Sequence, residues 1–191
     1  AGVLKRYTDQ VILTYDSDGA GVKAALRAIP ILRDAGISAR VLNMKPYKDP
    51  DEFIKNMGAD AFKERIAQAK NSFLFEIDVL KRNYQLEDPE QKTKFYQETA
   101  KKLLQFGEPL ERDNYIQAVS REQMIKEEEL RQLVNRLGMQ MGLKAGDSYR
   151  EMLPEEMLFP GKMEAVQVMI WAGRNMAAIL MRDRQRRTRR P

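Results

Sequence analysis

The chain has 191 residues, with 33 basic and 28 acidic side chains, and it contains neither cysteine nor histidine. These absences exclude disulfides, thiolate zinc sites, cysteine nucleophiles and histidine bases. A bound metal ion would therefore need oxygen ligands, which magnesium, manganese and calcium prefer. The net charge of +5 resides in the last ten residues, which contain six Arg and one Asp, and the rest of the chain is neutral.

The first part of the chain has the pattern of an α/β fold. Residues 11–15 (VILTY) form a short continuous run of β-forming residues, as expected of a strand buried on both faces. A helical pattern of apolar residues follows from Gly21, and Gly36 stands where a helix would end. Residues 38–44 predict a second strand. Strand, helix and strand at this spacing predict a right-handed βαβ unit with parallel strands.

Helices replace strands after about residue 50. One of them has Asp88 as its N-cap, Pro89 at its first position and Gln91 in the place of a capping box. The other expected helices span residues 53–57, 59–69, 73–84, 109–125 and 127–137, the last closed by Gly138. We therefore expect an α/β domain over residues 1–70 and an all-α helical bundle over residues 71–140.

The C-terminal part is expected to lie outside both domains. Residues 141–161 contain three Gly and two Pro and are interpreted as a linker. Residues 162–181 predict one amphipathic helix, and Glu164 and Arg174 argue against a membrane span. The region 162–191 ends in an Arg-rich tail that would contact nucleic-acid phosphate or remain solvated. The arginines of this candidate site are Arg184, Arg186, Arg187, Arg189 and Arg190.

Two acidic clusters follow the two predicted strands. Asp16 and Asp18 come directly after the first strand, and Asp49 and Asp51 come after the second. Ligands of parallel sheets bind beyond the carboxyl ends of the strands, where these four residues would gather. Carboxylates without histidine or cysteine suit Mg²⁺ or Mn²⁺, and such sites commonly handle phosphate groups. The four residues are the predicted metal ligands.

Helix capping is the alternative interpretation of the same residues. Asp18 could cap the helix that follows it, and residues 49–52 (DPDE) read as a capping box with Pro at the first helical position. For Asp49 alone, capping is the better interpretation. Capping does not explain Asp16, because one side chain is enough to cap a helix. Whether a helix N-terminus or a metal ion offsets the Asp16–Asp18 charge stays open at this point.

The motifs YDSDGAG (residues 15–21) and KDPDEFI (residues 48–54) closely resemble the later part of the Toprim domain of bacterial DNA primases of the DnaG type. The resemblance extends over roughly residues 3 to 140 and includes the helical bundle. It implies a partial Toprim fold in which Asp16 and Asp18 are catalytic and bind magnesium, while Asp49 and Asp51 complete the metal-binding surface. The metal ions of this family position a ribonucleoside triphosphate for attack by the primer 3′-hydroxyl.

The implied function is template-directed synthesis of short RNA primers on single-stranded DNA during replication. The implied partners are the DNA template, ribonucleoside triphosphates and the replicative helicase, the last through parts that we expect to be largely absent here. The family's EGYMD-like motif has no counterpart before Val11. We therefore expect a cytoplasmic primase fragment without zinc that is inactive by itself.

Two other functions remain possible on the sequence alone. One is another Toprim enzyme, a topoisomerase or a nuclease, which would need a nucleophilic Tyr on a separate domain or further acidic motifs. The other is a non-catalytic Toprim remnant or a module that binds a replication partner.

Overall fold

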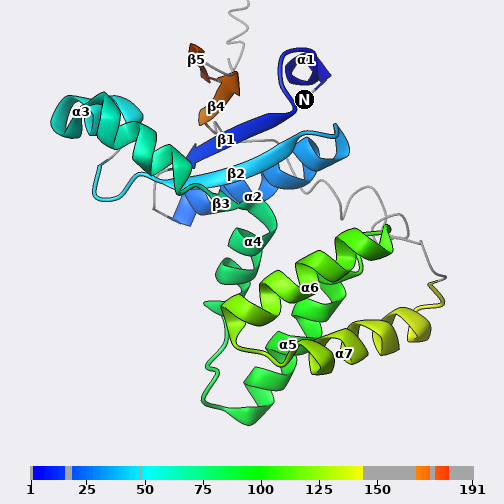
Figure 1. Ribbon diagram of the computed structural model, residues 1–191. Coiled ribbons are helices and arrows are strands. Elements are labelled where there is room, and N and C mark those ends of the chain that lie inside the picture. Colours follow the sequence, from blue (N-terminus) through cyan, green and yellow to red (C-terminus); the bar gives the residue numbers. More distant parts are fainter. Residues whose placement is uncertain (1, 16–18, 48, 144–166, 173–174, 181–191) are drawn as a thin grey trace, which may run out of the picture. The chain divides into compact units, whose positions relative to one another are not determined.

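The computed structural model describes residues 2–15, 19–47, 49–143, 167–172 and 175–180, and they fall into two compact units (Figure 1). Unit 1 comprises Ala1–Ser72 and Phe159–Pro191, and unit 2 comprises Phe73–Leu158. No helix within the described ranges is both long enough and apolar enough to cross a membrane. The predicted tail after residue 181 lies outside the described residues.

Unit 1 contains the predicted βαβ unit. Strand β1 (Gln10–Tyr15) and strand β2 (Ser38–Asn43) pair in parallel, and helix α2 (Gly19–Asp34) connects them. Every residue of β1 from Val11 to Thr14 is buried, so this strand is enclosed on both faces, as its continuous run of β-forming residues predicts. A short helix α1 (Gly2–Lys5) precedes them. The α/β expectation for the first part of the chain is confirmed.

The end of α2 has the predicted glycine cap. Gly36 has φ = 68°, a left-handed conformation in which a side chain would be strained. The amide of Ile37 donates to the carbonyl of Leu32 at 2.9 Å, which satisfies a carbonyl that the helix end leaves without a partner. This turn directs the chain into β2 beside β1.

Helix α3 (Pro50–Ala67) follows β2 and is bent at Gly58, where φ = 84° and ψ = 166° are not helical. The bend separates the two short helices that the sequence predicts. Phe53 lies on one side of it and Phe62 on the other, and their ring centroids are 5.8 Å apart. Both rings pack with Leu42 and Met44 in one buried cluster, so α3 is held against β2.

Strand β3 (Lys70–Asn71) closes the first stretch of unit 1 by pairing antiparallel with β2. The guanidinium of Arg40 on β2 also donates to the carbonyl of Ala69 at 3.0 Å. The sequence gives little indication of a strand this short.

The single helix expected over residues 162–181 is wrong for the described part of that segment. Residues 167–172 form strand β4 (Gln167–Ala172), and residues 175–180 form strand β5 (Asn175–Leu180). β4 pairs antiparallel with both β1 and β5, which gives the sheet order β3-β2-β1-β4-β5. Short apolar runs are ambiguous between helix and strand, so the sequence pattern alone could not distinguish two six-residue strands from one helix.

Unit 2 is a helical bundle with a continuous core. Its helices are α4 (Ser72–Lys81), α5 (Pro89–Leu103), α6 (Pro109–Gln123) and α7 (Glu127–Gln140). Phe73, Phe95 and Leu103 are among the fully buried residues of the core. α5 and α6 each begin with a proline preceded by an acidic N-cap, Asp88 and Glu108, so their starts are set by sequence. The region fits the expected all-α bundle.

Gly138 does not close the last helix as predicted. α7 continues to Gln140, and the chain turns at Gly142, where φ = 69°. Gly138 is buried inside the helix, and a Cβ added there would lie 3.3 Å from Cδ2 of Leu104. The glycine is therefore explained by close packing of α7 on the end of α5, which sequence periodicity cannot reveal.

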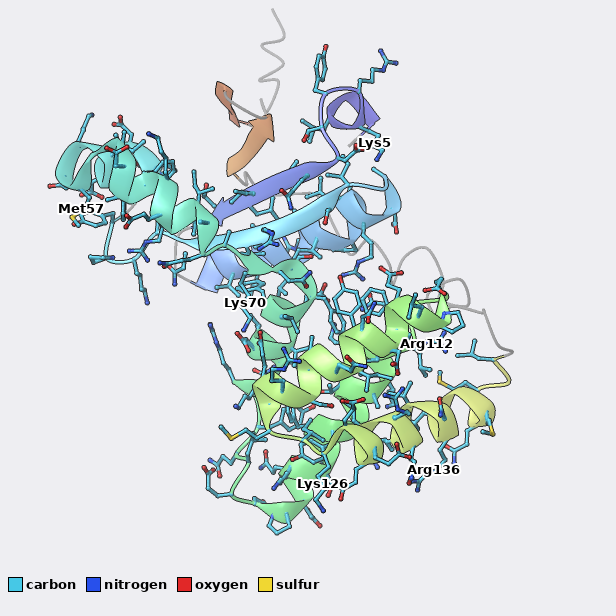
Figure 2. The ribbon with its side chains drawn as sticks, viewed as in Figure 1. Lys5, Met57, Lys70, Arg112, Lys126 and Arg136 are labelled. Carbon is cyan, nitrogen blue, oxygen red and sulfur yellow. The ribbon has the colours of Figure 1, made fainter. Side chains whose placement is uncertain are left out.

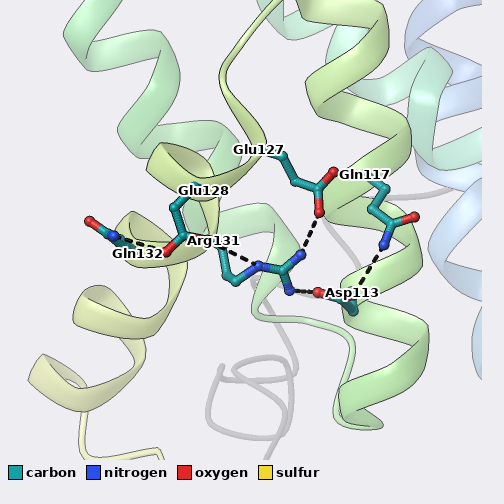
Figure 3. Close-up of polar contacts among 6 residues, drawn as sticks. All are labelled: Asp113, Gln117, Glu127, Glu128, Arg131 and Gln132. Carbon is teal, nitrogen blue, oxygen red and sulfur yellow. Dashed lines mark hydrogen bonds and ion pairs between the residues drawn. The ribbon is translucent and has the colours of Figure 1, made fainter.

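Charged residues join α6 to α7 beside this core (Figure 3). The guanidinium of Arg131 on α7 forms ion pairs with Asp113 on α6 and, at 2.6 Å, with Glu127 on its own helix. Gln117 on α6 donates to Asp113 at 3.3 Å. The Arg131 and Asp113 side chains are each 30% exposed, so solvent screens the pair only in part.

Candidate functional site

The edge of the sheet where β1 and β2 end is the first candidate site. The parallel register places Tyr15, the last residue of β1, opposite Asn43, the last residue of β2. Both strands therefore deliver the chain to the same edge, as the sequence predicts. The segments that follow each strand contain the predicted carboxylates, and this edge is where ligands of parallel sheets bind.

Asp16 and Asp18 lie outside the described residues, so their contacts stay a prediction. The residues on either side of them are described: β1 ends at Tyr15 and α2 begins at Gly19. A Cβ added at Gly19 would meet no described atom within 4 Å, so there is space beside the first turn of α2. The amino end of this 16-residue helix carries partial positive charge, which favours anionic groups close to it.

Asp49 is the N-cap of α3. Its Oδ1 accepts a hydrogen bond from the amide of Glu52 at 2.8 Å, and Pro50 occupies the first helical position. This geometry confirms the capping interpretation of Asp49. A carboxylate has about four lone-pair sites and the cap uses one of them, so capping does not exclude a further partner for Asp49.

Asp51 is exposed on the first turn of α3 and pairs with Lys55, one turn further along, at 2.6 Å. The hydrogen bond from Lys55 to Asp51 and the charge of Asp51 raise the pKa of the lysine above its ordinary value. A pair of this kind between exposed side chains is weak and exchanges readily with water or ions. Asp51 could therefore change partner without disturbing the helix.

No group of three or more Asp, Glu, His or Cys side chains gathers within the described ranges in a way that could hold a metal ion. The predicted ligand set includes two residues outside those ranges, so its assembly is not tested. Its chemistry suits the ion: all four predicted ligands are carboxylates, and hard divalent cations prefer oxygen.

The surface of unit 2 is the second candidate site. Over its described part, the large exposed apolar side chains are Leu110, Met124 and Met139, which are 67%, 91% and 76% exposed. Several of its charged residues form ion pairs along or between helices, for example Lys102 with Glu76 at 3.1 Å. Arg112 turns inward, donates from Nε to the carbonyl of Phe106 at 2.7 Å, and has its pKa lowered by burial.

Met124 is a feature that sequence reasoning missed, because the expected helix of residues 109–125 passed through it. α6 ends at Gln123, and Met124 follows in a left-handed conformation with φ = 54° and ψ = 40°. It is the non-glycine residue with positive φ among the described residues. Glycine or asparagine ordinarily marks such a position, so the sequence carried no signal for it.

Two family models match the chain, one in each unit. A Toprim-like family matches residues 1–54, which include all four predicted carboxylates. A family described as the DnaB-helicase binding domain of primase matches residues 73–128, from the start of unit 2 to the first turn of α7. The expectation that helicase-binding parts are largely absent is therefore corrected, since this match falls on the bundle itself.

Similar proteins include DNA primases of two bacteria. The chain is 33% identical over 135 residues to the DNA primase of Clostridium acetobutylicum, a match that covers 71% of this chain and 22% of that protein. It is 31% identical over 134 residues to the DNA primase of Listeria innocua, with 69% of this chain and 21% of that protein covered. The chain thus spans about a fifth of the length of these relatives.

Solved structures agree with this similarity. A DNA primase domain from Pseudomonas aeruginosa matches with a TM-score of 0.53 and 26% identity, over 70% of this chain and 43% of that one. A structure of the DnaG catalytic core matches with a TM-score of 0.53 and 27% identity, over 67% of this chain and 43% of that one.

Proposed function

This chain is related to the bacterial DNA primases of the DnaG type, and from this premise we propose that it is a primase segment that contributes a metal-binding edge and a helicase-binding bundle to RNA primer synthesis. The observation that supports the proposal most is the succession of the two family matches, 1–54 and 73–128, on the two structural units. Such an enzyme would act on single-stranded DNA in the cytoplasm.

At the sheet edge, we propose that Asp16 and Asp18 hold Mg²⁺, with Asp49 and Asp51 nearby as supporting carboxylates. The bound ion would offset the charge of a ribonucleoside triphosphate at the edge where β1 and β2 end. The chain's own contribution is placement. In support, the parallel register ends β1 and β2 at one edge, and the cap that Asp49 provides fixes the start of α3.

At the bundle, we propose that α4, α5 and α6 bind a replicative helicase of the DnaB type. The support is the family match over residues 73–128 together with the continuous buried core of the region, which includes Phe73, Phe95 and Leu103. A preformed surface loses little conformational entropy when a partner binds.

The metal proposal is tested by titrating the full chain with Mg²⁺ and following backbone amides by NMR. We expect the resonances of residues 19–21 to shift, and Asp16→Asn to abolish the shift. Asp9→Asn is the matched control, because Asp9 is an exposed aspartate that precedes the opposite end of β1. Shifts that persist in Asp16→Asn, or no shift at about millimolar Mg²⁺, would contradict the proposal.

The helicase proposal is tested by surface binding of the full chain to its cognate DnaB-type helicase. We expect saturable binding that survives Asp16→Asn, since the two proposed sites lie in separate units. A chain that is folded by circular dichroism and does not bind the helicase would contradict this part of the proposal and leave the metal site untouched.

A further inference from the structure

We propose that Met124, in the turn between α6 and α7, is the apolar anchor of the bundle on the helicase and inserts into an apolar pocket of that partner. This inference rests on the proposed helicase-binding function. Met124 has two unusual properties: its side chain is highly exposed, and its backbone is in a left-handed conformation.

The turn presents Met124 outward in a fixed way. Gln123 and Ile125, its neighbours in sequence, are only 8% and 6% exposed, whereas Met124 is 91% exposed. Ile125 belongs to the core of unit 2, and the side-chain amide Nε2 of Gln123 donates to Oδ1 of Asp78 on α4 at 3.2 Å. The amide of Ile125 also donates to the carbonyl of Ser120 at 3.0 Å. Two anchored neighbours thus hold a protruding side chain between them.

The backbone at Met124 is unfavourable for the residue that occupies it. With φ = 54° and ψ = 40°, it lies in the left-handed region, where glycine and asparagine are accommodated better than other residues. Methionine contributes nothing to the core from this position, because almost all of its side chain is in solvent. Strain together with exposed apolar surface indicates a role outside the folding of the bundle.

The surroundings suit a binding contact with an apolar centre and a charged rim. Lys126, labelled in Figure 2, lies in the same turn and pairs with Glu129 at 3.0 Å, and their side chains are 83% and 61% exposed. Methionine adapts its shape to irregular pockets and is enriched at interfaces. The family match over residues 73–128 includes this turn, which is why the helicase is the partner we infer.

Among the described residues of unit 2, the other exposed apolar residues do not share both properties. Met139 is 76% exposed, but it lies within α7 in ordinary helical conformation and outside the matched region. It is therefore the matched control, a methionine of similar exposure on the same bundle.

The experiment compares stability and binding in the full chain. Met124→Asn relieves the backbone, so we expect its melting temperature to equal or exceed that of the wild type, while its affinity for the helicase falls about tenfold or more. Met124→Leu keeps an apolar side chain and should bind within about threefold of the wild type. Met139→Asn should leave the affinity unchanged.

The outcomes separate this inference from the function on which it rests. If the wild type binds the helicase and Met124→Asn binds equally well, the inference is overturned and the proposed function stands. If Met124→Leu loses as much affinity as Met124→Asn, an apolar anchor is also excluded. If the folded wild type does not bind the helicase, the proposed helicase binding fails, and the inference fails with it.

Discussion

The ion pair between Arg131 and Asp113 joins the last two helices of the bundle, since Arg131 lies on α7 and Asp113 on α6. Arg131 also pairs with Glu127, so one guanidinium serves carboxylates from two helices. Its planar group with five N–H donors can satisfy both, which a lysine could not do with the same geometry.

Replacing Arg131 by Met should lower the free energy of unfolding of the bundle by about 1–2 kcal/mol, between the values typical of exposed and of buried pairs. Urea denaturation followed by circular dichroism measures the change. Arg136→Met is the matched control, because Arg136 is an exposed arginine on the same helix. Equal losses in the two variants would show that the pair has no special role.

Replacing Gly138 should reveal the contact with Leu104. In an open helix, Gly→Ala stabilises by up to about 1 kcal/mol. At Gly138 we expect no such gain, and Gly138→Leu should destabilise by about 1–3 kcal/mol because the core has no room for the side chain. Combining Gly138→Leu with Leu104→Ala should cost less than the sum of the two changes, and simple additivity would contradict the contact.

Substitutions at Asp49 should separate its capping role from a role in metal binding. Asp49→Ala removes the cap of α3 and should lower stability by about 1 kcal/mol, whereas Asp49→Asn keeps an oxygen that can accept from Glu52. Thermal melting measures the first effect. Asp49→Asn should nevertheless weaken Mg²⁺ binding in the NMR titration, because it removes a charge. Unchanged Mg²⁺ affinity in Asp49→Asn would limit this residue to capping.

Residues 71–143 should fold by themselves as a helical bundle. Their buried cluster is complete within this segment, and the connections between its helices are short. We expect a helical circular-dichroism spectrum and one cooperative thermal transition. A broad, non-cooperative transition would show that the bundle depends on unit 1.

The parts of the fold that could be predicted from sequence are those set by local signals. β1 was evident from an unbroken apolar run, and Gly36 and Asp49 marked helix boundaries by their intrinsic chemistry. Gly138 was misinterpreted because its reason is a neighbour 34 positions earlier in the chain, Leu104, which no local pattern reveals. β4 and β5 were missed because apolar residues in short runs fit a helix as well as a strand.

For the candidate site, the sequence could predict only the edge of the sheet at which the site lies. Parallel strands joined by a helix imply that the segments after them share an edge, and the register of β1 with β2 confirms this. The proposed helicase binding rests on the family match over residues 73–128 and not on periodicity, which carries no information about a binding surface. Met124 in particular lacks the glycine or asparagine that would have indicated the turn.

The boundary between Ser72 and Phe73 has a consequence for how genes of this kind can change. The helicase-binding family match and unit 2 both begin at Phe73, and the cores of the two units share no residue. A recombination event at this codon boundary would leave each core intact. Evolution could therefore exchange the bundle for another one, and with it the proposed helicase contact, without rebuilding the sheet in which β1 and β2 pair.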